Sequence, residues 1–233
     1  ERVGPITQLS WMGAPVSQYG DVVIDPDVDA PALLRAALAL VRARSGADVL
    51  RLRKVREDSA IAPFLAEIDA RILSEDTAPY LTLSGVSDAD YEKRLSSGAR
   101  RKRRQKRRKL EEQSAVGFVR ATAGAEAQAL IETTFRLKRA WLKSRGLLSA
   151  AFSDPRMQQL FIALASDTSR PAGFHIQAVT CGGQPVAIET GFICKGRCAP
   201  HISAYEPAFE RYSVGQLLWE DSIRHARADG VAI

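Results

Sequence analysis

Apolar positions recur along the chain with two periods, one typical of helices and one typical of strands. The clearest helical stripe runs through residues 125–145, and Gly146 stands just beyond its predicted end. Further helices are predicted over 30–44, 61–73 and 156–165. Alternating runs predict strands over 19–24, 48–55, 79–83 and 116–121. This succession predicts an α/β fold with mixed sheets flanked by helices.

The last third of the chain has the most regular order of elements. Strands are predicted over Phe174–Cys181, Pro185–Cys194 and Cys198–Tyr205. The turn Gly182-Gly183-Gln184 is a hairpin signal, and a helix that runs to about Ala228 follows the third strand.

The start of that last helix is a candidate anion site. A helix N-terminus presents unpaired backbone N–H groups and the positive end of a dipole, which suits a pyrophosphate. Ser213 is a good N-cap, and Gly215 allows another group to approach the backbone closely. With the hairpin ahead of it, the segment suggests a site for a phosphate-rich acyl carrier.

Composition sets the broad class. The chain has 233 residues, enough for one large domain or two small ones, and its 45% hydrophobic content is ample for a core. No stretch approaches the roughly 20 apolar residues that span a bilayer, so no transmembrane segment is expected. Three cysteines do not suggest a disulfide framework, and a reduced, cytoplasmic location is the default expectation.

Charge is concentrated in one segment. The formal net charge is +6, but without the nine cations of residues 100–109 it becomes 24 basic against 27 acidic residues, or −3. These nine residues are Arg100, Arg101, Lys102, Arg103, Arg104, Lys106, Arg107, Arg108 and Lys109. They fall in a helix predicted to run from about Ser87 to Gln113, where they would cover every face. The segment is either a solvated helix end or a site for a polyanion such as tRNA or an anionic membrane surface.

Cys194, Cys198 and His201 have a spacing that superficially resembles a metal site. Zinc needs a fourth ligand or an open water position, and no fourth candidate lies nearby in the sequence. No metal is therefore expected, and the two cysteines are predicted to face each other across a hairpin loop as packing residues.

Three residues of the last strands are candidates for proton transfer. Glu189 lies in an apolar run, where it is either an outward-facing strand residue or a base that takes a proton from an attacking amine. Strict alternation places His201 and Tyr205 on one face together with Ser203. Each of the two is either a proton donor or acceptor, or a structural residue.

An ordered set of motifs carries a resemblance to a known family. The motifs are the segments 9–21, 141–146, 152–155, 183–187, 201–207 and 212–218. Together they resemble the Gcn5-related N-acetyltransferase (GNAT) superfamily, in the branch of CelD-type cellulose-biosynthesis proteins, which is itself similar to the Fem-type peptidyltransferases. The loop from Arg211 to Gln216 loosely matches the acyl-carrier loop of that superfamily.

The resemblance implies two tandem acetyltransferase-like modules, over 1–114 and 115–233, with the acyl-carrier loop in the second. It implies an N-acyltransferase that uses acetyl-CoA or another acyl-CoA and acts on an amine or sugar acceptor linked to exopolysaccharide or cellulose biosynthesis. The implied carrier-binding residues are Arg211, Ser213, Val214, Gly215 and Gln216. Glu189 is the candidate base, and Tyr205 or His201 the candidate acid.

Two other functions stay open at this stage. One is aminoacyl transfer from charged tRNA, as in the Fem-type relatives, which the basic segment motivates. The other is a non-catalytic binding module of a polysaccharide assembly.

Overall fold

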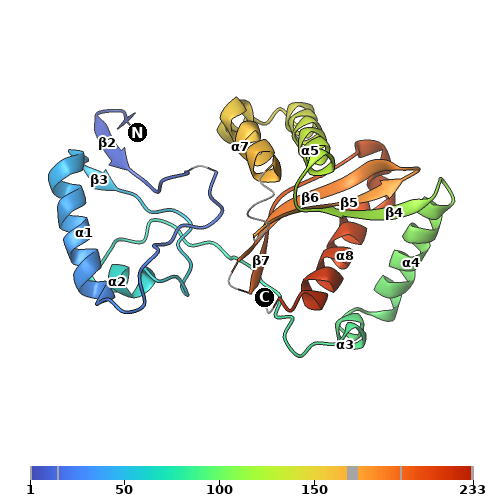
Figure 1. Ribbon diagram of the computed structural model, residues 1–233, viewed down its shortest axis with the longest axis horizontal. Helices are drawn as coiled ribbons and strands as arrows, with labels where there is room; N and C mark the ends of the chain where they lie inside the picture. The colour runs from blue at the N-terminus through green and yellow to red at the C-terminus, as the bar shows by residue number, and fades with distance from the viewer. Residues whose placement is uncertain (1, 15, 167–172, 195, 232–233) are drawn as a thin grey trace. The chain divides into compact units, whose positions relative to one another are not determined.

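The computed structural model describes residues 2–14, 16–166, 173–194 and 196–231 (Figure 1). The chain forms two compact units, and the boundary between them falls between Pro79 and Tyr80. The division into tandem modules at residues 114 and 115 stays a prediction, because the compact units of a chain need not coincide with the repeats of its fold.

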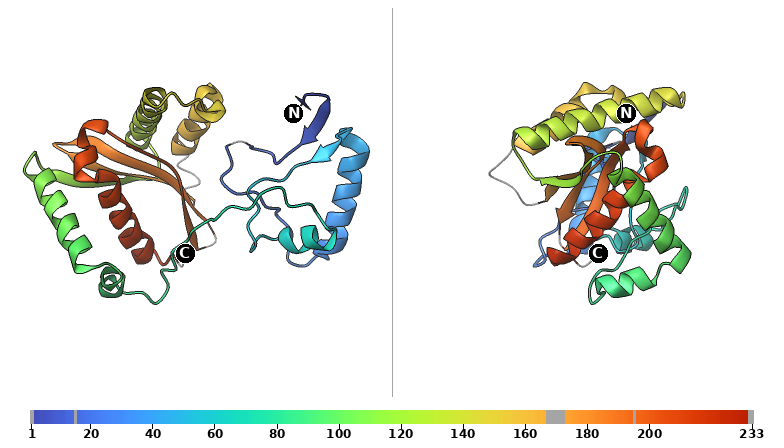
Figure 2. Two further views of the ribbon diagram at one scale, coloured as in Figure 1. Left: turned by 180° about the vertical axis from the view of Figure 1, so that it is seen from behind. Right: turned by 90° about the vertical axis from the view of Figure 1, so that its right-hand side faces the viewer.

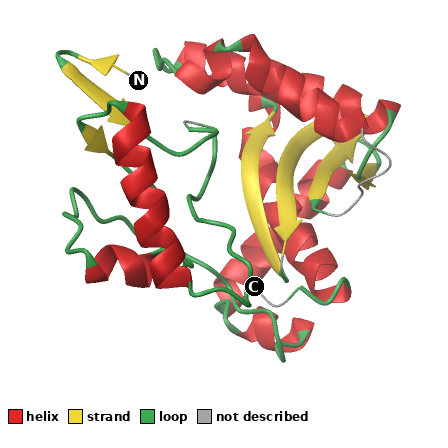
Figure 3. Cartoon of the chain, turned by 60° about the vertical axis from the view of Figure 1, so that its left-hand side comes forward, coloured by secondary structure: helices red, strands yellow, loops and turns green. Residues whose placement is uncertain are grey.

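The first unit is small. Its three-stranded sheet has the order β1-β2-β3, with β1 (Arg2–Val3) antiparallel to β2 (Ile6–Leu9) and β2 parallel to β3 (Val49–Leu50). The helices are α1 (Ala30–Ser45) and α2 (Ala62–Glu67), coloured red in Figure 3. Leu34, Ile61 and Phe64 form the buried centre of this unit.

Two strands predicted in this part of the sequence are wrong. Residues 19–24 are a loop whose Val22 and Ile24 pack against the small core, while the Asp21 carboxylate accepts hydrogen bonds from the backbone of Ala60 and Ile61. Residues 79–83 are also a loop, in which Leu83 is buried. In both segments some apolar side chains pack against a core while others, such as Val23 and Tyr80, are exposed, and neither segment is paired as a strand of a sheet.

The second unit is built on a four-stranded antiparallel sheet. Its strands are β4 (Val116–Ala121), β5 (Phe174–Cys181), β6 (Gln184–Cys194) and β7 (Arg197–Tyr205), in the order β4-β5-β6-β7. Gly182 and Gly183 both have positive φ in the turn between β5 and β6, as a tight two-residue hairpin requires. The mixed α/β class predicted from the sequence is thus confirmed.

Helices cover both faces of this sheet. On one face lie α5 (Ala125–Ser144), α6 (Ala150–Ser153) and α7 (Pro155–Ser166), and on the other α8 (Val214–Ala228) packs beside α4 (Ser97–Glu111), as Figures 1 and 2 show. The short 3₁₀ helix η1 (Pro207–Tyr212) connects β7 to α8.

The predicted single helix from about Ser87 to Gln113 is wrong, because it is broken in two. α3 (Asp88–Lys93) ends before Ser96, which has an extended backbone and caps α4: its side-chain hydroxyl accepts a hydrogen bond from the backbone N–H of Ala99. The Arg100 guanidinium donates to the carbonyls of Glu92 and Leu95 and so closes the corner between the helices.

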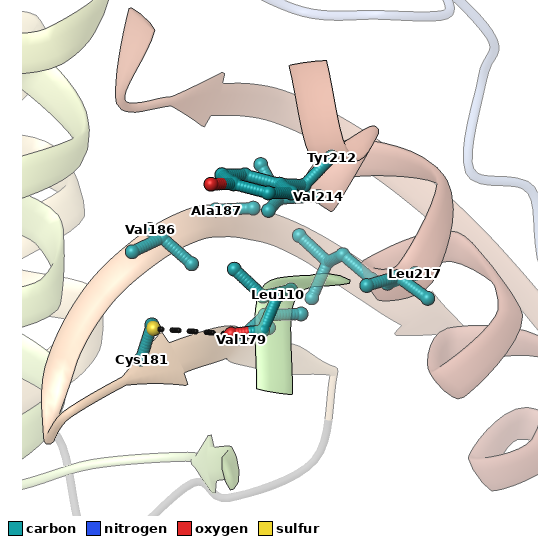
Figure 4. Close-up of a cluster of buried hydrophobic side chains, with 9 residues drawn as sticks. Leu110, Val179, Cys181, Val186, Ala187, Tyr212, Val214 and Leu217 are labelled. Carbon is teal, nitrogen blue, oxygen red and sulfur yellow. Dashed lines mark hydrogen bonds between the residues drawn. The ribbon is translucent and has the colours of Figure 1, made fainter. Parts of the chain in front are cut away.

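The buried residue of α4 is Leu110, near the C-terminal end of the helix. Leu110 is fully buried among residues of β5, β6 and α8 (Figure 4). The Cys181 thiol lies 4.0 Å from the Leu110 carbonyl in the same cluster. A helix that is basic around most of its circumference is thereby packed against the body of the protein.

Candidate functional site

The turn between η1 and α8 has an unusual backbone. Ser213 adopts the left-handed conformation, with φ 54° and ψ 45°, which a residue other than glycine rarely adopts. Ser213 occupies the N-cap position as expected, but its side chain makes no capping hydrogen bond. The predicted side-chain cap is therefore wrong. The N–H groups of Gln216 and Leu217 both donate to the Ser213 carbonyl, at 2.9 and 3.2 Å. The N–H groups ahead of them have no partner within the helix, so the start of α8 is open to an external acceptor.

A shallow, open pocket of about 270 Å³ lies at this helix start. Its lining residues are Tyr205, Glu210, Ser213, Val214, Gly215 and Gln216. Four of the five predicted carrier-binding residues are among them, and Tyr205 joins them from the end of β7. Around Gly215, no atom lies within 4 Å of the position that a Cβ would take, so its surface is accessible.

Arg211, the fifth predicted carrier-binding residue, is not among those that line this pocket. Its side chain is exposed, stacks over the Tyr212 ring with 4.8 Å between guanidinium carbon and ring centroid, and donates to the Tyr212 hydroxyl at 2.7 Å.

The inner face of the basic helix contacts the same turn. The Lys106 ammonium donates to the Ser213 hydroxyl. The Arg103 guanidinium forms an ion pair with Glu220 at 2.8 Å. With its amide oxygen facing α4, Gln216 accepts from Arg103 Nη2 at 2.7 Å. No sequence pattern indicates that these two separately predicted regions are neighbours.

Tyr205 and Glu210 are the two titratable residues that line the pocket. The Tyr205 hydroxyl donates to Glu210 Oε1 at 3.2 Å. Partial burial and the adjacent Glu210 carboxylate raise the pKa of Tyr205 above its ordinary value of 10.0. The side chain therefore carries its proton at neutral pH and can donate it.

Glu189 lies beneath α8 in a buried polar network. The carboxylate is fully inaccessible, so the expectation of an outward-facing strand residue is wrong. It accepts hydrogen bonds from Gln177 Nε2 on β5 at 2.9 Å, from Ser222 Oγ on α8 at 3.2 Å and from Ser203 Oγ on β7 at 3.4 Å. Burial raises the pKa of Glu189, and the hydrogen bonds oppose that rise.

Ser203 connects this network to the surface. It stands opposite Glu189 in the β6–β7 register and is itself exposed. Ser203 and Tyr205 are two residues apart on one strand, roughly 7 Å along it. Glu189 does not line the pocket. It is connected to the strand surface near Tyr205 through the Ser203 hydroxyl.

His201 is separated from Ser203 and Tyr205. The β6–β7 register shifts between Thr190 and Gly191, which leaves His201 as an extra residue on β7. Its ring stacks on Phe161 of α7 at 5.6 Å, on the opposite face of the sheet. The expectation of one shared face is therefore wrong, because strict alternation does not persist through a bulge.

The prediction that Cys194 and Cys198 face each other across the last hairpin is wrong. Cys198 pairs with Ile193, and Cys194 pairs with Arg197. Burial raises the pKa of the Cys198 thiol to about 11, so it is unreactive at neutral pH. Among the described residues, no group of three or more His, Cys, Asp or Glu side chains is arranged to hold a metal ion.

The comparisons with known proteins agree with this architecture. The fold defines an α/β protein whose antiparallel sheet is flanked by helices and leads through a turn into an open helix start. A family model described as an acetyltransferase (GNAT) domain matches residues 97–233, more than half of the chain. The chain therefore belongs to the GNAT acetyltransferase family. No curated protein matches it.

The family match confirms the superfamily part of the resemblance and leaves the CelD-type branch and the Fem relationship as predictions. The matched region begins at the first residue of α4, so the basic helix belongs to it. Within the part of the chain that the structure describes, no helix has both the length and the apolarity needed to cross a membrane.

Proposed function

We propose that this protein is an N-acyltransferase that takes its acyl group from acetyl-CoA or another acyl-CoA. The observation that carries the proposal is the open start of α8, where accessible Gly215 and Tyr205 line one pocket. Backbone N–H groups at such a helix start bind a pyrophosphate, and the positive end of the helix dipole favours its charge. The family match supports the same class of reaction.

The reaction is the direct transfer of an acyl group to an amine. The amine nitrogen attacks the thioester carbonyl, the carbon–sulfur bond breaks, and the acyl group stays on nitrogen. The proton released by the amine passes through the Ser203 hydroxyl to Glu189, whose raised pKa suits a proton acceptor. The Tyr205 hydroxyl protonates the departing thiolate.

The acceptor is the finer part of the proposal. The motif order that resembles CelD-type proteins supports an amine or sugar acceptor from exopolysaccharide or cellulose synthesis. The tandem arrangement of two acetyltransferase-like modules belongs to the same hypothesis.

Calorimetric titration with acetyl-CoA and CoA tests the carrier site. We expect binding by the unchanged protein and its loss in Gly215→Trp, because an indole at this position fills the pocket beside the N–H groups. Gly215→Ala is the structural control, since the added methyl group meets no atom within 4 Å. Ala228→Trp, at the exposed far end of α8, controls for a bulky substitution in the same helix.

Equal binding by Gly215→Trp and Ala228→Trp would place the carrier elsewhere. No binding by the unchanged protein would remove the proposed activity altogether.

A further inference from the structure

The nine cations of the basic segment differ in their surroundings. Three of them contact the body of the protein: Arg100 at the carbonyls of Glu92 and Leu95, Arg103 at Glu220 and Lys106 at Ser213. Arg107 pairs with Glu111 along the helix and lies over the Phe118 ring. The remaining five are exposed: Arg101, Lys102, Arg104, Arg108 and Lys109.

These five residues form what we call the outward basic face of α4. Arg101, Arg104 and Arg108 follow one another at helical spacing on a single stripe, and Lys102 and Lys109 flank it two turns apart. Arg108 has an exposed partner, Glu112, at 3.5 Å. For the other four, no hydrogen bond or ion pair of the side chain is formed with any described residue. The face therefore presents a high density of charge that the protein itself hardly neutralises.

This arrangement is unfavourable unless an anion approaches it. Arg100 and Arg104, and Arg104 and Arg108, are like charges four residues apart, which repel each other on a helix surface. The rest of the chain has a net charge of −3, so the basic face is a local feature and not part of a generally basic surface. An extended polyanion relieves the repulsion through several contacts at once.

The side chains on this face indicate which polyanion fits. A helix that lies in a membrane interface carries apolar residues for the acyl region, but the outward basic face and the neighbouring Gln105 contain none. It also has no aromatic residue on which single-stranded bases would stack. Arginine, which binds phosphate bidentately, supplies three of the five cations.

We propose that the outward basic face of α4 binds the phosphodiester backbone of a double-helical nucleic acid. From Arg101 to Lys109 the helix rises about 12 Å, and a duplex carries about seven charges over that length of its axis. The five cations are thus fewer than the roughly seven phosphate charges over the same length, so each can contact a phosphate of its own without base contacts. This interaction is independent of the pocket at α8, because none of the five residues lines it.

The test measures binding of a labelled short RNA duplex, and of a DNA duplex of the same sequence, at increasing salt. Five phosphate contacts predict a log–log slope of about −4.5, or a roughly 500-fold loss of affinity between about 50 and 200 mM salt. In the triple variant Arg101→Gln, Arg104→Gln, Lys109→Gln, two contacts remain, and the slope falls to about −1.8. Glutamine keeps the helix propensity at these exposed positions.

The matched control also removes three positive charges, two from α1 and one from the segment after β3. Arg42→Gln, Arg44→Gln, Arg51→Gln changes three exposed cations of the first unit and leaves the duplex affinity unchanged. An equal loss in both triple variants would show that only net charge matters and would overturn the proposal.

Two other results would also overturn it: no duplex binding by the unchanged protein, or binding only to phosphatidylserine vesicles. Both triple variants should bind acetyl-CoA as the unchanged protein does, because none of the substituted residues lines the pocket at α8. A failure of duplex binding is thereby distinguished from a failure of the proposed acyltransferase activity.

Discussion

Replacing Glu189 separates a structural role of the buried network from a catalytic one. In Glu189→Gln the amide oxygen still accepts from Gln177 Nε2, and the hydroxyls of Ser203 and Ser222 rotate to meet the new amide group. We expect the free energy of unfolding to change by no more than about 1 kcal/mol. Glu189→Ala removes all three acceptor contacts and leaves a cavity under α8, so we expect a loss on the order of 3–5 kcal/mol.

The dependence of stability on pH has a definite sign. Burial raises the pKa of Glu189 in the folded state above its ordinary 4.5. The group therefore favours folding fully below about pH 4.5, and this contribution is lost as the pH rises through the folded-state pKa. Glu189→Gln removes the dependence, so unfolding curves of the two proteins diverge progressively as the pH increases from 4.5.

Turnover supplies the second measurement. If Glu189 accepts the amine proton through Ser203, Glu189→Gln lowers kcat by about 10²- to 10⁴-fold while acetyl-CoA binding persists. Release of free thiol from acetyl-CoA in the presence of an accepted amine measures this rate. Unchanged turnover in a folded Glu189→Gln protein would refute the role of Glu189 as base. If that variant unfolds, the expectation that the glutamine amide keeps the hydrogen bonds of the network is refuted.

Three further predictions concern other parts of the second unit. Tyr205→Phe should lower turnover without weakening acetyl-CoA binding in calorimetry, because it removes the proposed proton donor and the contact with Glu210 but leaves the helix start unchanged. Equal loss of binding would contradict that role. Leu110→Ala should cost about 2–5 kcal/mol in denaturant unfolding, since the side chain is fully buried where α4 joins the core, whereas Leu95→Ala, half-buried between α3 and α4, should cost less. Burial lowers the pKa of His175 from 6.5 to about 4, with a small contribution from Arg120 that Asp229 opposes. Its contribution to stability is therefore present above pH 6.5 and is lost as the pH falls toward 4. At about 1.4 kcal/mol per pKa unit this loss is roughly 3 kcal/mol, and it should be absent from His175→Asn in acid unfolding curves.

Much of the fold has local causes that a sequence shows directly. The stripe of apolar residues predicted the helix that runs from Ala125 to Ser144, and the paired glycines predicted the hairpin between β5 and β6. The last three strands were predicted to within one residue at each end. In each case the decisive interactions join residues that are near neighbours in the chain.

The candidate site depends on contacts that are remote in sequence. Its lining at Ser213–Gln216 was predicted, because a serine and a glycine at a helix start are visible in the sequence. The contact between the Lys106 ammonium and the Ser213 hydroxyl spans 107 residues, and no local pattern indicates it.

The sequence by itself determined the four strands of the second unit, its helices α5, α7 and α8, and which helix start could meet an anion. Only the tertiary structure decided that Glu189 is buried, because alternation divides a strand into two faces without saying that α8 covers one of them. The tertiary structure also decided the bulge at His201. It decided as well which cations of α4 contact the body of the protein and which face outward. Local propensity acts over a few residues, whereas burial and register follow from which distant segments pack together.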